Sequence, residues 1–159
     1  MTPSGGSPGR IPRGPALPGT SRSEVREPSV VKKVVPRVIA YECCLGDGPP
    51  LHELLESEGY DLVAFREGEG LLEAAVERPA DVVVYEFDPD RQGELGQLQL
   101  LRRVAPAVPL ILLSCRGSLE LQRLLQALRP AYYAIRPLDT DELREAVRSV
   151  LERRRSRAG

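Results

Sequence analysis

Residues 81 to 90, DVVVYEFDPD, contain the strand that decides the fold. The segment from Val82 to Tyr85 is apolar throughout, which is typical of a strand buried on both faces of a parallel sheet. Glu86 follows directly, and burying a carboxylate there is costly unless the strand opens onto a site. Ligands bind beyond the carboxyl ends of the strands in open parallel sheets. We therefore expect Glu86 to mark a functional edge of the sheet.

Apolar runs of strand length alternate with segments of helical period on both sides of this strand. Such alternation predicts parallel strands joined by right-handed helical crossovers, with helices covering both faces of the sheet. The other strands are expected at residues 37–43, 61–65, 108–115 and 131–137, and the helices within 49–59, 69–79, 93–106, 118–130 and 139–155.

The length and composition fit one folded domain with a tail. The chain has 159 residues, of which 42% are hydrophobic, enough for a single core. Residues 1–34 are rich in Pro, Gly and Arg with few large apolar side chains, so we expect a disordered tail there. A basic docking arm is the alternative for this segment. The folded domain is expected over residues 35–155, followed by a flexible end at 156–159.

Charge and hydropathy exclude several classes of function. The net charge of −1 gives no general attraction to nucleic acid or anionic membranes, although residues 1–36 hold six basic and two acidic side chains, a net charge of +4. No stretch approaches the ~20 apolar residues of a membrane span. The N-terminus lacks the run of ~7–15 apolar residues that a secretory signal needs. We expect a cytoplasmic protein that binds neither nucleic acid nor membrane.

Polar residues fall at the predicted carboxyl ends of the strands, and together they resemble one known family. The segments PADVVVYEF, ILLSC and YYAIRPLDTDEL are similar to the third strand, the fourth strand and the fifth strand with the last helix of response-regulator receiver domains. The resemblance covers roughly residues 37–152. It implies a flavodoxin-like α/β/α sandwich with five parallel strands in the order 2-1-3-4-5.

The resemblance also implies a role for each of these residues. Glu86 would stand at the phosphoacceptor position, and Glu42 and Cys43 would stand at the family's acidic pair. Ser114 and Tyr133 would be the switch residues. Arg136 would replace the family's lysine, and Pro137 would be a candidate cis-proline.

The departures from the family pattern predict that phosphotransfer is lost. Receiver chemistry needs carboxylates around Mg²⁺ and an acceptor of defined length. Here Cys43 offers a thiol that suits Mg²⁺ poorly, Glu86 is one methylene longer than Asp, and Pro89 comes one residue early in the loop after the acceptor. Arg136 replaces a point charge with a planar fork. We expect no catalytic residue, no resident metal and no cofactor, and therefore no enzymatic activity.

Without a metal, Glu86 needs a cation, and Arg136 is the basic residue placed to supply it. The third and fifth strands lie two spacings apart, roughly 10 Å, which Glu and Arg can span together. We predict a Glu86–Arg136 salt bridge that holds Ser114 and Tyr133 in one arrangement. Glu86 is then either a fixed mimic of the activated state or a vestigial group, and the sequence leaves both open.

The cysteines and the single histidine give weaker signals. Cys43, Cys44 and Cys115 fall near one edge of the sheet, where a soft-metal or redox site is conceivable. Cys43 and Cys115 would lie ~10 Å apart on strands one and four, too far for a disulfide. Buried thiols acting as small hydrophobes are the favoured interpretation. His52 is expected on the surface, without a catalytic role.

Two functions from different classes fit the sequence. The first is a stand-alone receiver-like signalling module of a two-component or phosphorelay pathway, acting through protein contacts without Asp phosphorylation. The second is a flavodoxin-like protein that binds a nucleotide or another small ligand at the strand ends. For the first, the resemblance implies that a protein partner or a second copy binds the face of the fourth helix, fifth strand and fifth helix, including Leu119, Tyr132, Arg144 and Arg148.

Overall fold

The computed structural model describes residues 34–43, 48–137 and 139–158. The predicted tail, apart from Val34, lies outside these residues. The fold is one compact unit that begins at Val35. Strands and helices alternate within it: β1 (Arg37–Tyr41), α1 (Leu51–Glu56), β2 (Asp61–Phe65), α2 (Gly68–Glu77), β3 (Val82–Phe87), α3 (Glu94–Val104), β4 (Leu110–Ser114), α4 (Leu119–Gln126), β5 (Tyr132–Ile135) and α5 (Thr140–Ala158).

The strands form one parallel sheet in the order β2-β1-β3-β4-β5, which confirms the predicted fold class. β3 lies in the middle of the sheet, and Tyr85 pairs in register with Tyr41 of β1 and Leu112 of β4. All six residues of β3 are buried. Its unbroken apolar run follows from this position, because a central parallel strand has no solvent face.

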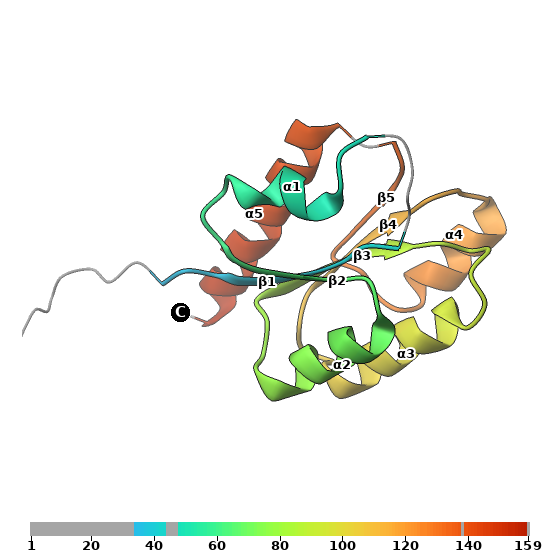
Figure 1. Cartoon of the computed structure of the whole chain (residues 1–159), viewed down its shortest axis with the longest axis horizontal. Coiled ribbons are helices and arrows are strands. Elements are labelled where there is room, and N and C mark those ends of the chain that lie inside the picture. The colour runs from blue at the N-terminus through green and yellow to red at the C-terminus, as the bar shows by residue number, and fades with distance from the viewer. Residues whose placement is uncertain (1–33, 44–47, 138, 159) are drawn as a thin grey trace, which may run out of the picture. The chain divides into compact units, whose positions relative to one another are not determined.

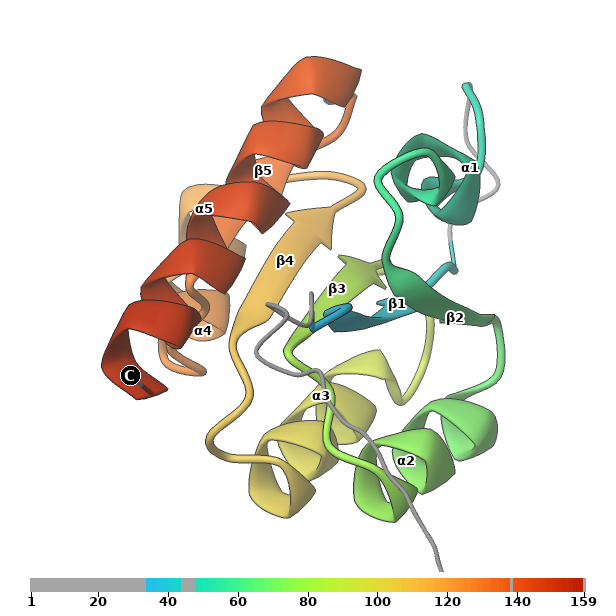
Figure 2. The same cartoon turned by 90° about the vertical axis from the view of Figure 1, so that its left-hand side faces the viewer.

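Helices cover both faces of the sheet (Figures 1 and 2). One face packs on α1 and α5 through Leu51, Leu55, Leu143, Val147 and Val150. The other face packs on α2, α3 and α4 through Leu71, Leu98, Leu101 and Leu125. Each layer buries apolar side chains at helical spacing against alternate residues of the strands, which is the main stabilising contribution to such a domain.

Arg102 ties α3 to the segments that flank β4. Its guanidinium donates hydrogen bonds to the backbone carbonyls of Leu128 (3.0 Å), Val108 (2.6 Å) and Arg129 (3.2 Å). Arg129 has a positive φ of 56°, so the chain reverses sharply here before β5. Burial lowers the pKa of Arg102. One side chain thus donates to three backbone carbonyls of the segments that precede β4 and β5.

The last helix is longer than the sequence suggested. α5 continues to Ala158, so residues 156–158 are helical and the predicted flexible end is wrong for them. Arg154 explains part of this extension, because it reaches Asp81 (3.4 Å) and the carbonyl of Ala107 (3.3 Å) and so docks the final turns on the domain. Among the described residues, no helix is long and apolar enough to cross a membrane.

Candidate functional site

The carboxyl edge of the sheet presents different chemistry on its two faces. β1 and β3 pair in register through Tyr41 and Tyr85, and successive side chains of a strand point to opposite faces. Tyr41 and Tyr85 belong to the core on the α2, α3 and α4 side. The next residues, Glu42 and Glu86, therefore lie on the α1 and α5 side. The centre of this edge thus has two tyrosines on one face and two carboxylates on the other.

Glu86 is almost fully buried, with 1% of its surface exposed, and Arg136 pairs with it. The Arg136 guanidinium donates to Glu86 Oε2, so the predicted ion pair is present. Arg136 comes from the segment after β5, and its peptide bond to Pro137 is cis, as the resemblance implied. The pair compensates a charge that could not be buried alone. It occupies the edge beside β4 on the α1 and α5 side.

Glu42 is also buried, with 6% of its surface exposed, and it contacts His52 and Arg66. Its Oε2 accepts from the backbone N–H of His52 (2.5 Å) and lies 2.7 Å from His52 Nδ1. Its Oε1 lies 3.6 Å from Arg66 Nε. His52 is therefore held by a specific contact, where the sequence suggested only a surface position. The two neighbouring carboxylates, Glu42 and Glu86, therefore have separate partners.

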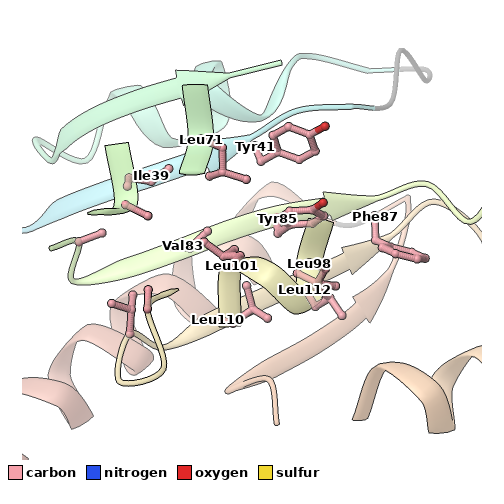
Figure 3. Packing of buried hydrophobic residues seen from close by; sticks show 14 of the residues in the cluster. Ile39, Tyr41, Leu71, Val83, Tyr85, Phe87, Leu98, Leu101, Leu110 and Leu112 are labelled. Carbon is pink, nitrogen blue, oxygen red and sulfur yellow. The ribbon is translucent and has the colours of Figure 1, made fainter. Parts of the chain in front are cut away.

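Tyr41 and Tyr85 fill the opposite face of the edge. Their ring centroids are 4.6 Å apart, and Figure 3 shows both hydroxyls directed toward the carboxyl end of the strands. The Tyr85 hydroxyl accepts from Gln97 Nε2 at 2.8 Å. Burial raises the pKa of both tyrosines, most strongly that of Tyr85. Neither side chain is exposed, so this face of the edge is packed rather than open.

Glu94 adds a buried carboxyl to the tyrosine face. It is the first residue of α3 and is 4% exposed, and its Oε2 has no hydrogen-bond partner. Burial raises the pKa of Glu94, and Arg91, whose Nε lies 4.0 Å away, opposes that rise together with the side chains of Tyr85 and Cys43. A buried carboxylate oxygen without a donor costs free energy. Ionisation of Glu94 is therefore costly at this position.

Cys43, Ser114 and Tyr133 lie on the tyrosine face. Cys43 and Tyr133 pack against the core on the α2, α3 and α4 side. Ser114 lies two residues after Leu112 on β4, so its side chain points to the same face as that core residue. The Cys43 thiol donates to the carbonyl of Glu86 at 2.6 Å, and burial raises its pKa to about 12. The Ser114 hydroxyl donates to the carbonyl of Arg116. The Tyr133 hydroxyl is buried without a hydrogen-bond partner.

The predicted site residues therefore do not converge. Glu42, Glu86 and Arg136 gather on one face, and the two switch residues lie on the other. Among the described residues, no hydrogen bond joins the side chains of the Glu86–Arg136 pair to those of Ser114 or Tyr133, although the Arg136 backbone N–H donates to the Ser114 carbonyl at 2.8 Å. The expectation that the pair holds both residues in one arrangement stays a prediction. Strand parity explains the separation, since adjacent residues of β3 point to opposite faces.

Tyr85 competes with Glu86 for the phosphoacceptor position. Like Val83 and Phe87 of β3, it lies on the face of Cys43 and Ser114, and it is the polar side chain among these three. In the receiver pattern, a proline follows the acceptor at a set distance in the next loop. Pro89 comes one residue too early if Glu86 is the acceptor, and at the expected distance if Tyr85 is. The assignment of Glu86 stays a prediction, and Tyr85 has the better geometry.

The cysteines differ from the sequence-based interpretation at one position. Cys115 is disulfide-bonded, so the expectation of a buried thiol was wrong for this residue. Cys44 lies outside the described residues. β3 separates β1 from β4, as the argument against a Cys43–Cys115 bridge required. Within the described ranges, no three His, Cys, Asp or Glu side chains are grouped so as to hold a metal ion.

Several residues of the site gave no signal in the sequence. Gln97 and Glu94 lie on α3, and His52 lies ten residues beyond its partner Glu42. Nothing in the local pattern distinguishes them from ordinary helix residues. The one available signal was Glu94 at the first helical position, where acidic residues are favoured for their effect on the helix dipole rather than for burial.

Comparison with solved structures gives the class of fold. The CheY-like receiver domain protein from Methanospirillum hungatei JF-1 is 16% identical, with a TM-score of 0.66, over 78% of this chain and 99% of its own. The receiver domain of a putative Luxo repressor protein from Vibrio parahaemolyticus is 21% identical, with a TM-score of 0.62, over 79% and 96%.

A response regulator protein from Burkholderia multivorans is 20% identical, with a TM-score of 0.58, over 74% of this chain and 95% of its own. These similarities confirm that the chain has the receiver fold. No family model matches the sequence, and no curated protein matches it.

Proposed function

We propose that the protein is a receiver-like signalling module of a two-component or phosphorelay pathway that acts through protein contacts without Asp phosphorylation. The observation that carries this proposal is the closed carboxyl edge. Glu86 is buried and paired with Arg136, and Tyr85 is buried against Tyr41. Neither candidate for the acceptor position offers an accessible Asp carboxylate. Phosphoryl transfer depends on such a group held close to a metal ion.

The closed edge favours this proposal over a small-ligand site at the strand ends. Glu42 and Glu86 already have polar partners in His52, Arg66 and Arg136, so a charged ligand would have to displace existing contacts, including the Glu86–Arg136 ion pair. Breaking a buried pair leaves an uncompensated charge, which costs several kcal/mol, about 3–5. A signalling role needs no ligand at this edge.

Incubation with acetyl phosphate and Mg²⁺, followed by intact-mass measurement, tests the proposal. We expect no phosphoryl adduct, because no acceptor carboxylate of the required kind is accessible. Asp88 and Asp90 lie in the adjacent loop, so Asp88→Asn and Asp90→Asn variants are the matched controls. A phosphoryl gain that disappears only in Glu86→Ala would contradict the proposal. Thermal-shift arms with flavin and nucleotides would reveal the alternative function.

For the partner, we propose a surface of α4 and β5 defined by Leu119 and Ile135. These are exposed apolar side chains, and such groups are enriched at sites of protein contact. Of the face first expected, Leu119 lies on this surface. Arg144 and Arg148 instead face α1, since both reach Glu58 (3.4 and 3.5 Å). Partner binding that survives Leu119→Asp and Ile135→Asp together would count against this surface.

A further inference from the structure

A second group of exposed apolar side chains lies on α2 and α3. Val76 is 65% exposed, and Leu100 and Val104 are each 40% exposed. The two helices lie side by side in both views (Figures 1 and 2) and bury their inner residues in the same core. We call Val76, Leu100 and Val104 the α2–α3 strip. It is separate from the surface of α4 and β5 proposed above.

Helix geometry places the three residues of the strip near one another. A Cβ atom at Gly68, the first residue of α2, would collide with the side chain of Gln97 in the first turn of α3. The first turns of the two helices therefore face each other. Both helices follow parallel strands and rise about 1.5 Å per residue, so they stay level along their length. Val76, eight residues after Gly68, is therefore level with the last turn of α3. Leu100 and Val104 are one turn apart on a single ridge.

A row of carboxylates borders the strip. Glu69, Glu73 and Glu77 are exposed and recur every fourth residue, so they form one ridge of α2 next to Val76. In the part of the chain that the structure describes, no basic side chain lies within salt-bridge distance of them. Arg103 of α3 is the exposed cation beside Val104. The strip is thus bordered by three carboxylates and one guanidinium.

This arrangement costs the helix stability. Like charges four residues apart destabilise a helix by about 0.2–0.5 kcal/mol per pair. Glu77 also lies in the last turn of α2, where a negative charge opposes the helix dipole and no basic residue compensates it. α3 shows the favourable pattern, with Arg102 and Arg103 in its last turn. Among the described residues, no ion pair offsets the destabilising effect of these charges on α2.

We propose that the α2–α3 strip and the row Glu69, Glu73 and Glu77 bind a basic amphipathic helix of a partner protein. Such a helix presents apolar side chains on one face and Lys or Arg at four-residue spacing along its flank, which matches both the strip and the row. The excess of carboxylates favours this partner over a second copy of the chain, whose own row would repel the first. The proposal does not depend on the state of Glu86.

Fluorescence anisotropy with a labelled synthetic helix tests the proposal. The probe has leucines on one face and lysines on the other, and the full chain is titrated into it at low salt. We expect binding that weakens at least ~10-fold in Leu100→Asn and in the double variant Glu73→Gln/Glu77→Gln, with the latter also less sensitive to salt. The matched control is Leu124→Asn on α4, which should bind as the parent does.

Three further arms can overturn the proposal. A peptide with glutamates in place of lysines, or with the leucines scattered around the helix, must bind at least ~10-fold more weakly, and equal binding contradicts the charge and shape argument. Equal loss in Leu100→Asn and Leu124→Asn would place the contact elsewhere. Sedimentation equilibrium without peptide reports self-association, and a dimer that Leu100→Asn dissolves would assign the strip to a second copy. All substituted positions are exposed, and circular dichroism checks the fold.

Discussion

The two faces of the carboxyl edge differ although the same two strands build them. On the α1 and α5 face, Glu42 and Glu86 are buried and each has its own polar partners. On the other face, Tyr41 and Tyr85 fill the space with rings, and Glu94 is the buried carboxyl that is poorly satisfied. Adjacent residues of β3 lie in different environments, because the side chain of Tyr85 points to the aromatic face and that of Glu86 to the charged face. The charged face is closed by ion pairs and the aromatic face by packing, and different changes should open them.

The largest effect is expected on the aromatic face. Tyr85→Ala removes a buried ring and leaves a cavity between β3 and α3, which should cost about 3–5 kcal/mol of unfolding free energy. Tyr85→Phe keeps the ring and loses only the bond to Gln97, so it should cost about 1 kcal/mol. Denaturant unfolding of the two variants measures the difference. Equal costs would mean that packing does not close this face.

A smaller effect is expected on the charged face at Glu42. Glu42→Gln weakens the contacts to His52 and Arg66 and should cost about 1–2 kcal/mol, since hydrogen bonds to charged groups contribute more than neutral ones. Glu53→Gln in the same helix as His52 is the matched control, because Glu53 is exposed and makes no such contact. Indistinguishable denaturation midpoints for the two variants would show that the Glu42 cluster does not contribute to stability.

Substitution of Glu94 should stabilise the protein. Burial raises the pKa of Glu94 above its unfolded value, so the folded state binds the proton more tightly and the cost of ionisation is present at neutral pH. Glu94→Gln removes that cost and should gain about 1 kcal/mol at pH 7. The gain should shrink as the pH falls below the unfolded pKa, where both states are protonated. A gain that is the same at acid and neutral pH would refute the role of ionisation.

The smallest effect concerns the ionisation of the tyrosines. Burial raises the pKa of Tyr41 and Tyr85, so both should stay protonated above the ordinary tyrosine pKa of about 10. Their contribution to stability is complete below that pH and is lost as the pH rises further, because the unfolded state ionises first. Ultraviolet absorbance titration should give the same curve for the parent and Tyr85→Phe until unfolding begins. A missing ionisation in Tyr85→Phe near pH 10 would show that Tyr85 is accessible.

The sequence was sufficient for the fold and for one contact of the site. Each strand is a short apolar run between helical segments, and β3 is identified by its run of valines. The Glu86–Arg136 pair followed from the lengths of the two side chains and from their strand positions.

The sequence could not tell on which face each edge residue lies. A strand buried on both sides has no alternation of polar and apolar residues, so Tyr85 and Glu86 carry no sign of their face. The partners of Glu42 and the burial of Glu94 depend on where α1 and α3 begin relative to the sheet. Those positions are set by packing rather than by any local pattern.

A double-mutant cycle on Glu86 and Arg136 tests most directly whether an ion pair closes the charged face. Denaturant unfolding is measured for the parent, Glu86→Gln, Arg136→Met and the double variant. We predict a coupling of about 2–3 kcal/mol, with Arg136→Met the more costly single change because it leaves the more deeply buried charge unpaired. Costs that add to within about 0.5 kcal/mol would contradict a closed edge held by this pair.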